Sequence, residues 1–213
     1  MAQFPESDSL GCMHGEPVLL DVRTGIVVQT ARSAEGIFGG TVLTTSGKGK
    51  TDAEEFIEAS RVFLHDQFLP KLTYCLEEMP EEDIWWRPNE QSNSVGNLIL
   101  HLCGNMKQWI VSSIGGGQFE RDRDAEFSAR SPVSKAELIA NIRAAAAQVD
   151  QVLAALPTKI LLERFSIQGY GTSALYAIYH VVEHFSYHLG QILYIYKMRT
   201  GKDPGFYRHL SNR

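Results

Sequence analysis

The chain has 213 residues, of which 44% are hydrophobic and 21% charged, a composition that can form one domain with an extension or two small domains. Its formal net charge of −5 and the absence of any run of lysine and arginine argue against a nucleic-acid-binding surface. We expect a cytoplasmic protein, because no stretch has the form of a signal peptide or a membrane span and the three cysteines are widely spaced, as free thiols are.

Residues 1–50 differ in pattern from the rest of the chain. Short apolar runs such as Val18-Leu19-Leu20 alternate with glycine and other turn residues, and no helical period is present. This pattern fits one or two hairpins, or a disordered arm. We predict an irregular N-terminal extension over residues 1–50, flexible or weakly structured, followed by a folded domain over residues 51–213.

The first predicted helix begins at Thr51, where Thr51 and Glu54 have the spacing of a capping box, and it continues to about Glu78. Pro70 lies inside this helix. We therefore expect a kink or a break after Leu69, since proline lacks the N–H group that a helix interior requires.

The second predicted helix starts at Asn93 or Ser94 and runs to about Ser113, where a run of glycines follows. Its apolar residues form one stripe on a helical wheel, and His101 stands at the edge of that stripe. Asn105 lies beside His101 on the wheel. An isolated histidine in such a place is usually hydrogen-bonded within the core, so its role depends on the rest of the chain.

Two connections carry bulky or charged residues. Residues 79–89 contain Trp85 and Trp86 between two prolines, and we expect these rings to cap the helices, with the lining of a pocket mouth as the alternative. Residues 118–127 are dense in both charge signs, and we expect a solvated crossover with local ion pairs. In the alternative interpretation, Arg121 or Arg123 of this crossover binds an anionic group of a substrate.

Two further helices are predicted in the second half of the domain. One is opened by a capping box at Ser134 and ends near Leu156, and we interpret it as scaffold because it contains no histidine. A short extended segment follows. The last helix is then capped by Thr172 or Ser173 and ends before Gly201.

The last helix carries His180, His184 and His188 at four-residue intervals. Residues four apart lie about 40° apart around a helix, so two imidazoles one turn apart can bind a single metal ion. On the wheel His184 and His188 adjoin the buried face. His180 leans toward the exterior, and Gln191 falls close to His184.

If the histidine-bearing edges of the second and last helices meet, His101, His184 and His188 converge on one point. Three neutral imidazoles would hold a divalent ion and leave positions open for water or substrate. Burial of three imidazoles without a partner would be costly, which also favours an ion. The alternative is three separately hydrogen-bonded histidines and no ion.

Two segments of the chain resemble the DinB-like (DinB/YfiT) superfamily of metalloenzymes. They are residues 93–102, with the sequence NSVGNLILHL, and residues 184–191, with the sequence HFSYHLGQ. Members of this superfamily carry one histidine in the second helix and an H-x-x-x-H pair in the fourth, commonly followed by an arginine and then Gly-Gln. Leu189 replaces that arginine here, so no role of the arginine transfers to this chain.

The resemblance extends over residues 52–200 and implies an all-α fold, namely a four-helix bundle with long crossover connections that often forms a homodimer. It implies that the metal ligands are His101, His184 and His188, whereas His180 lies outside the set. The implied ion is zinc or nickel, with iron or manganese as alternatives. Functions in the superfamily include hydrolases and thiol-dependent S-transferases and isomerases, so the substrate does not transfer.

Our leading hypothesis is a metal-dependent transferase or hydrolase that activates a water or a low-molecular-weight thiol toward a small-molecule substrate, without nucleic acid or membrane as partner. His180, Asn105 and Gln191 are the candidates for proton transfer or for orienting the ligands. Glu183 points outward on the wheel, so no carboxylate is placed as a general base, and this favours thiol transfer over hydrolysis. The alternative is a non-catalytic, stress-related bundle that binds a metal or another ligand.

Overall fold

The computed structural model describes residues 12–13, 16–21, 26–29, 43–45, 49–131 and 133–208. The chain divides into two compact units, Met1–Thr51 and Asp52–Arg213. Within the first unit, four short strands pair antiparallel in the order β1-β2-β3-β4. They are β1 (Cys12–Met13), β2 (Glu16–Asp21), β3 (Ile26–Gln29) and β4 (Leu43–Thr45). The described part of this segment therefore consists of paired strands, one of the two possibilities that the sequence left open.

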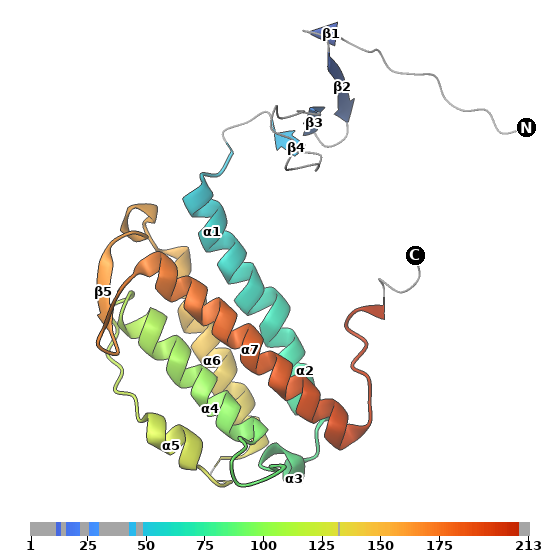
Figure 1. The fold of residues 1–213 in the computed structure, drawn as a ribbon, viewed down its shortest axis with the longest axis vertical. Helices are drawn as coiled ribbons and strands as arrows, with labels where there is room; N and C mark the ends of the chain where they lie inside the picture. Colours follow the sequence, from blue (N-terminus) through green and yellow to red (C-terminus); the bar gives the residue numbers. More distant parts are fainter. Residues whose placement is uncertain are drawn as a thin grey trace, which may run out of the picture. The chain divides into compact units, whose positions relative to one another are not determined.

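The second unit is mostly helical (Figure 1). It contains four long helical rods. The first is α1 (Asp52–Arg61), which continues through the π-helical segment Val62–Phe68 into α2 (Leu69–Glu78). The others are α4 (Val95–Met106) with the π-helical segment Lys107–Ser112, α6 (Lys135–Ala154) and α7 (Ala174–Thr200). The short elements are α3 (Glu81–Ile84), α5 (Arg123–Ser128), a 3-10 turn (Thr158–Ile160) and the hairpin of β5 (Arg164–Ile167) with β6 (Tyr170–Ser173). The predicted all-α fold class is confirmed.

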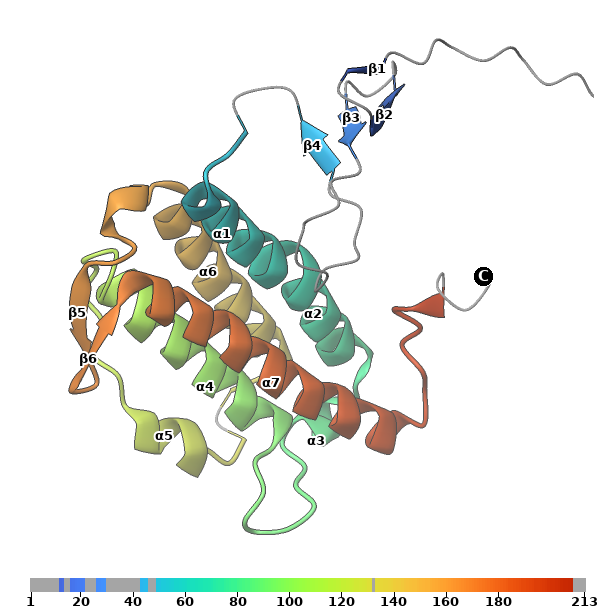
Figure 2. The ribbon, with the colours of Figure 1, turned by 45° about the horizontal axis from the view of Figure 1, so that its top comes forward.

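The long helices pack as a four-helix bundle. The helix α4 contacts α6 and α7, and the α1–α2 rod contacts the same two helices, so α4 and α2 occupy opposite corners. Figure 2 shows the four rods lying side by side, with α5 outside α4. The apolar stripes meet in one core, which includes the fully buried side chains of Leu72, Leu76, Ile99, Met106, Ile142, Phe185, Ile192 and Tyr196. Each of the buried Leu, Ile, Met and Phe side chains stabilises the fold by roughly 1.5–3 kcal/mol through its removal from water.

The helices begin and end where their sequence signals predict. Ser94 caps α4 by accepting a hydrogen bond from the amide of Asn97, and Ser134 caps α6 in the same way. Ser173 caps α7, and Gly201 ends it in the left-handed conformation with φ of 67°. These caps satisfy amide and carbonyl groups that a helix end otherwise leaves unpaired. The predicted starts of these three helices are confirmed.

The first helix is not broken at Pro70. A π-helical segment, Val62–Phe68, precedes the proline, and Pro70 itself lies in the first turn of α2. The proline ring crowds the carbonyl group four residues earlier and donates no hydrogen bond to it. The wider π-helical turns accommodate this mismatch, so the expected break is replaced by a local change of helix type.

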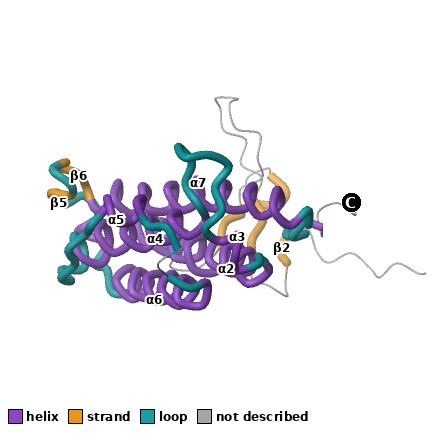
Figure 3. The backbone as a smooth tube through the Cα atoms, turned by 90° about the horizontal axis from the view of Figure 1, so that it is seen from below, coloured by secondary structure: helices purple, strands orange, loops and turns teal. Residues whose placement is uncertain are grey.

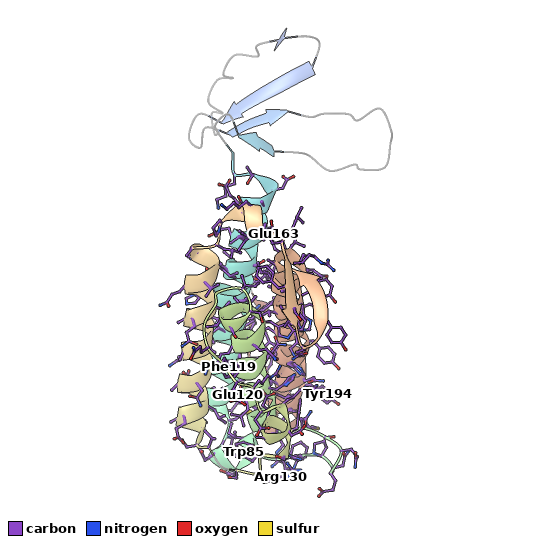
Figure 4. The ribbon with its side chains drawn as sticks, turned by 90° about the vertical axis from the view of Figure 1, so that its left-hand side faces the viewer. Trp85, Phe119, Glu120, Arg130, Glu163 and Tyr194 are labelled. Atoms are coloured by element: carbon purple, nitrogen blue, oxygen red, sulfur yellow. The ribbon has the colours of Figure 1, made fainter. Side chains whose placement is uncertain are left out.

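The two ends of the bundle are covered by different elements. At one end the ring of Trp85 packs against the backbone of Gly96, and its Nε1 donates a hydrogen bond to the carbonyl oxygen of Val133 at 3.1 Å (Figure 4). The expected capping role of this ring is confirmed. The β5–β6 hairpin lies at the opposite end (Figure 3). Among the described residues, no helix has both the length and the apolar character needed to cross a membrane.

Candidate metal centre

Three histidines converge between α4 and α7. One ring nitrogen from each of His101, His184 and His188 lies within 4.8 Å of the other two. Nε2 of His184 is 2.9 Å from Nε2 of His101, whereas two nitrogens on one tetrahedral zinc ion lie roughly 3.3 Å apart. His101 and His188 are only 4% and 7% exposed, and His184 is half-buried. This group of nitrogens could hold a metal ion after a small shift of the rings.

The hydrogen bond behind His188 directs a lone pair toward the centre of the cluster. Nδ1 of His188 lies 2.8 Å from Oε1 of Gln191, an oxygen that only accepts, so Nδ1 carries the proton. Nε2 of His188 then bears a lone pair, and this atom is buried with no hydrogen-bond partner among the described residues. A buried acceptor without a partner is costly, and a metal ion would satisfy it.

A buried ion pair holds the opposite side of His101. Nδ1 of His101 is 2.9 Å from Oε2 of Glu126. Arg121 clamps the same carboxylate, with Nε 2.7 Å from Oε1 and Nη2 2.8 Å from Oε2. Since Oε2 only accepts, Nδ1 of His101 donates to it, and Nε2 faces the cluster with its lone pair. A carboxylate behind a ligating histidine is a recurrent feature of metal sites.

The titratable groups are held in the states that metal binding requires. Burial would raise the pKa of Glu126, but hydrogen bonds from Arg121 and His101 more than compensate, so its pKa lies below the ordinary value. Burial and the neighbouring histidines lower the pKa of His184 to about 3. Burial also lowers the pKa of His188. His184 and His188 are therefore neutral near neutral pH, as metal ligands must be.

The helix α4 is shaped to receive α5. Asn97, one turn before His101, donates from Nδ2 to the backbone oxygen of Glu126 at 2.8 Å. Gly104 lies nearly one turn after His101, and a Cβ atom there would overlap Oε1 of Glu126 and come within 2.8 Å of Nε of Arg121. The amide of Asn97 thus fixes the position of Glu126, and the missing side chain of Gly104 leaves room for its carboxylate.

The prediction of a solvated crossover over residues 118–127 is wrong for Arg121 and Glu126. The side chains of Arg121 and Glu126 are only 4% and 9% exposed, and α5 forms within the crossover. The sequence shows a charged segment but does not show that its partner, His101, lies 25 positions earlier. Glu126 was therefore missed as a site residue. The available signals were Gly104 on the same face as His101 and the spacing of Arg121 from Glu126.

The three additional candidates lie around the cluster. Gln191 accepts the hydrogen bond from His188. The ring of His180 stacks on that of His184, with centroids 5.2 Å apart, and Nδ2 of Asn105 is 3.3 Å from Nε2 of His180. Burial lowers the pKa of His180. Gln191 and His180 thus contact the cluster directly, whereas Asn105 contacts His180, and the roles of all three residues in chemistry stay predictions.

A cavity of about 750 Å³ opens beside the cluster and is lined in part by His101, His180 and His184. The rest of its wall comes from Asn105 and Trp109 in the rod of α4, from the crossover, from the β5–β6 hairpin and from the first turn of α7. Cavities of this size accommodate small-molecule ligands.

The helical-bundle fold of this chain is shared with solved proteins, one of them described as DinB-like. Among solved structures, a DinB-like protein from Bacillus cereus is similar, with a TM-score of 0.55 and 17% identity over 72% of this chain and 97% of that chain. A conserved protein from Enterococcus faecalis has a TM-score of 0.52 and 13% identity over 70% and 96%. These likenesses establish the fold. The profile described as "Protein of unknown function (DUF1572)" matches residues 53–211, so the chain belongs to the DUF1572 family. No curated protein matches the chain significantly.

Proposed function

We propose that this chain is a metal-dependent enzyme of the DinB-like type, with His101, His184 and His188 as ligands of a divalent ion, zinc or nickel in the first instance. The observation that carries the proposal is the buried Nε2 of His188, which has no hydrogen-bond partner among the described residues and lies in a three-histidine cluster beside a cavity of about 750 Å³. A divalent ion at such a site supplies Lewis acidity, which lowers the pKa of a water or a low-molecular-weight thiol.

The residues behind the histidines prepare the cluster before any ligand arrives. Glu126 and Gln191 hold the Nδ1 protons of His101 and His188, so both Nε2 lone pairs face inward. Arg121 keeps Glu126 ionised through two short hydrogen bonds. Such support fixes the tautomer and the plane of each ring, which strengthens metal binding.

Proton transfer falls to a histidine rather than to a carboxylate. Glu126 already accepts hydrogen bonds from Arg121 and His101, and Glu183 is exposed on the outer side of α7. His180 is half-buried, lines the cavity and stacks on His184. A neutral imidazole there could accept a proton from a thiol or a water in the cavity. This arrangement favours activation of a thiol, which is more acidic than water.

Metal analysis of the purified protein tests the ligand set directly. We expect about one equivalent of a divalent metal in the wild-type protein and loss of nearly all of it in His184→Ala. Elemental analysis by mass spectrometry gives both the identity and the amount of the metal. Equal metal content in the two proteins would refute the assignment of His184.

Catalysis requires a second measurement. Metal-loaded protein incubated with panels of electrophiles and low-molecular-weight thiols should consume at least one pair faster than His184→Ala does. If metal is bound but no thiol or water reaction occurs, the chain is a metal-binding bundle without this activity.

A further inference from the structure

The cavity beside the histidines has a cationic wall. Three arginines line it, Arg121, Arg123 and Arg164, and none of the described residues that line it is an aspartate or a glutamate. Arg121 is neutralised by Glu126 at 2.7 Å. The charges of Arg123 and Arg164 have no carboxylate within ion-pair distance in the described part of the chain. Arg123 and Arg164 therefore give the cavity wall two positive charges that are not paired with a carboxylate.

Both of these arginines retain hydrogen-bond donors for a ligand. The guanidinium carbon of Arg123 lies 5.2 Å from the ring centre of Phe127, a cation–π contact that uses none of its N–H groups as a hydrogen-bond donor to an oxygen. Arg164 donates one hydrogen bond, from Nη2 to the backbone oxygen of Gly171 at 2.7 Å. A planar guanidinium with free N–H groups binds a carboxylate or a phosphate through paired hydrogen bonds.

The N-terminal end of α7 contributes the positive end of its helix dipole to the cavity, but its first backbone N–H groups are already hydrogen-bonded. The amides of Ala174 and Leu175 already bond to the carbonyl oxygens of Glu163 and Leu161. The amide of Tyr176 bonds to the side chain of the capping serine. The positive end of the helix dipole favours an anion nearby, but the arginine side chains must provide the hydrogen bonds.

The hairpin that carries Arg164 is tied to the metal side of the cavity. Nε2 of Gln168, in the hairpin turn, donates to Oε1 of Gln108 at 2.5 Å. The same oxygen accepts a hydrogen bond from Nη1 of Arg121 at 3.0 Å, and Arg121 holds the carboxylate behind His101. One network of hydrogen bonds therefore connects the cationic wall with the histidine cluster.

We infer that the cavity binds its substrate through an anionic oxyacid group, a carboxylate or a phosphate, held by Arg123 and Arg164, with the reactive end of the substrate at the histidines. This inference rests on the proposed function, since the histidine cluster is what makes the cavity a reaction site. Arg121 forms an ion pair with Glu126, so Arg123 and the hairpin residue Arg164 are the two arginines of the cavity wall that can bind the anionic group.

Titration calorimetry of the full-length protein with small probes tests the inference. The probes are glutarate, inorganic phosphate and the neutral analogue glutaramide, applied to metal-loaded and chelator-treated protein. We expect at least one anion to bind both forms, and glutaramide to bind at least tenfold more weakly. In Arg123→Gln combined with Arg164→Gln the affinity for that anion should fall at least tenfold, as the loss of charge-assisted hydrogen bonds predicts. Preference for glutarate or for phosphate identifies the group.

Matched variants separate this inference from the proposed function. Arg143→Gln removes the same charge from the surface of α6, outside the cavity, and should leave anion binding unchanged. Arg123→Gln alone tests the site if loss of Arg164 disturbs the hairpin. His188→Ala should lose the metal but keep its affinity for the anion, because His188 is not part of the cavity wall. If His188→Ala keeps the metal while the arginine variants lose the anion, the metal assignment falls and the anion site stands.

Three results would overturn the anion site. They are equal affinity of the wild-type protein and the double variant, equal affinity for glutaramide and for the anions, and no binding of any probe to the wild-type protein.

Discussion

A single carboxylate, Glu126, determines which nitrogen of His101 faces the cluster. Its Oε2 accepts hydrogen bonds from both His101 and Arg121, and the side chain is almost fully buried. Glu126→Gln would keep the size of the side chain but remove its charge. The hydrogen bond from His101 would weaken, and Arg121 would be left buried without a counter-ion. We expect the affinity for zinc to fall roughly 10- to 100-fold, the usual effect of losing such a partner.

Competition with a chromogenic zinc chelator measures this change. The control is Glu183→Gln, which removes a carboxylate on the exposed side of α7, next in sequence to His184. It should bind zinc as the wild-type protein does. Equal zinc affinity of Glu126→Gln and the wild-type protein would mean that Glu126 only packs α5 against α4.

The contrast between the histidines and Glu126 shows what a sequence can reveal about a site. The spacing of His184 and His188 is local, because any helix places residues four apart on one face. His101 could be added because it lies on the edge of its own apolar stripe. The position of Glu126 depends on the docking of α5 against Gly104 and Asn97. That docking depends on tertiary contacts, and no periodic pattern in the sequence of the crossover predicts it.

At the scale of elements, the starts of α4, α6 and α7 could be predicted because their caps are local side-chain signals. The hairpin of β5 and β6 was expected only as a brief extended segment. Its two-residue turn, Gln168–Gly169, has positive φ at both positions, 53° and 79°. Such turns usually carry Asn-Gly or Asp-Gly. Because glutamine occupies the first position, the sequence lacks the usual signal of this turn. The hairpin matters for the site because its Arg164 lines the cavity.

An ion pair between α1 and α6 gives the bundle a dependence on pH. Arg61 donates from Nε to Oδ1 of Asp150 at 2.7 Å and from Nη2 to Oδ2 at 3.2 Å. The hydrogen bond from Arg61 lowers the pKa of Asp150. A carboxylate with a lowered pKa stabilises the folded state fully above its ordinary pKa, about 3.8, and this stability is lost as the pH falls through the lowered value. The pair is partly exposed, so its contribution is about 0.2–1 kcal/mol.

Urea unfolding of the wild-type protein and Asp150→Asn measures the contribution. We expect the variant to be less stable by up to about 1 kcal/mol near pH 7, and the difference to shrink as the pH falls below about 4. Glu77→Gln is the control, since its pair with Arg143 is about half exposed and should contribute little. A difference that stays constant down to acidic pH would show that Asp150 acts through packing rather than charge.

For the molecule as a whole, the outer face of α7 carries a stripe of exposed tyrosines. Tyr176, Tyr179, Tyr187 and Tyr194 lie within about 80° of one another around the helix, and each is 56–70% exposed. Figure 4 shows Tyr194 at the outer edge of the bundle. A buried tyrosine covers about 150–250 Å², so this stripe supplies a substantial part of the roughly 800 Å² per partner that a stable dimer requires. A Cβ atom at Gly190, on the same stripe, would meet nothing within 4 Å, so this position is open to a partner.

We therefore predict a homodimer formed through the tyrosine stripe of α7. In size-exclusion chromatography with light scattering, the wild-type protein should have about twice the chain mass, and Tyr187→Glu combined with Tyr194→Glu should be a monomer. The substituted side chains are exposed within one chain, so folding should survive, because a charge costs little where water already has access. Leu162→Glu places the same charge at a residue 77% exposed outside α7 and should leave the dimer intact. A monomeric wild-type protein would contradict the prediction, and a dimer that persists in the tyrosine variant would place the interface on another face.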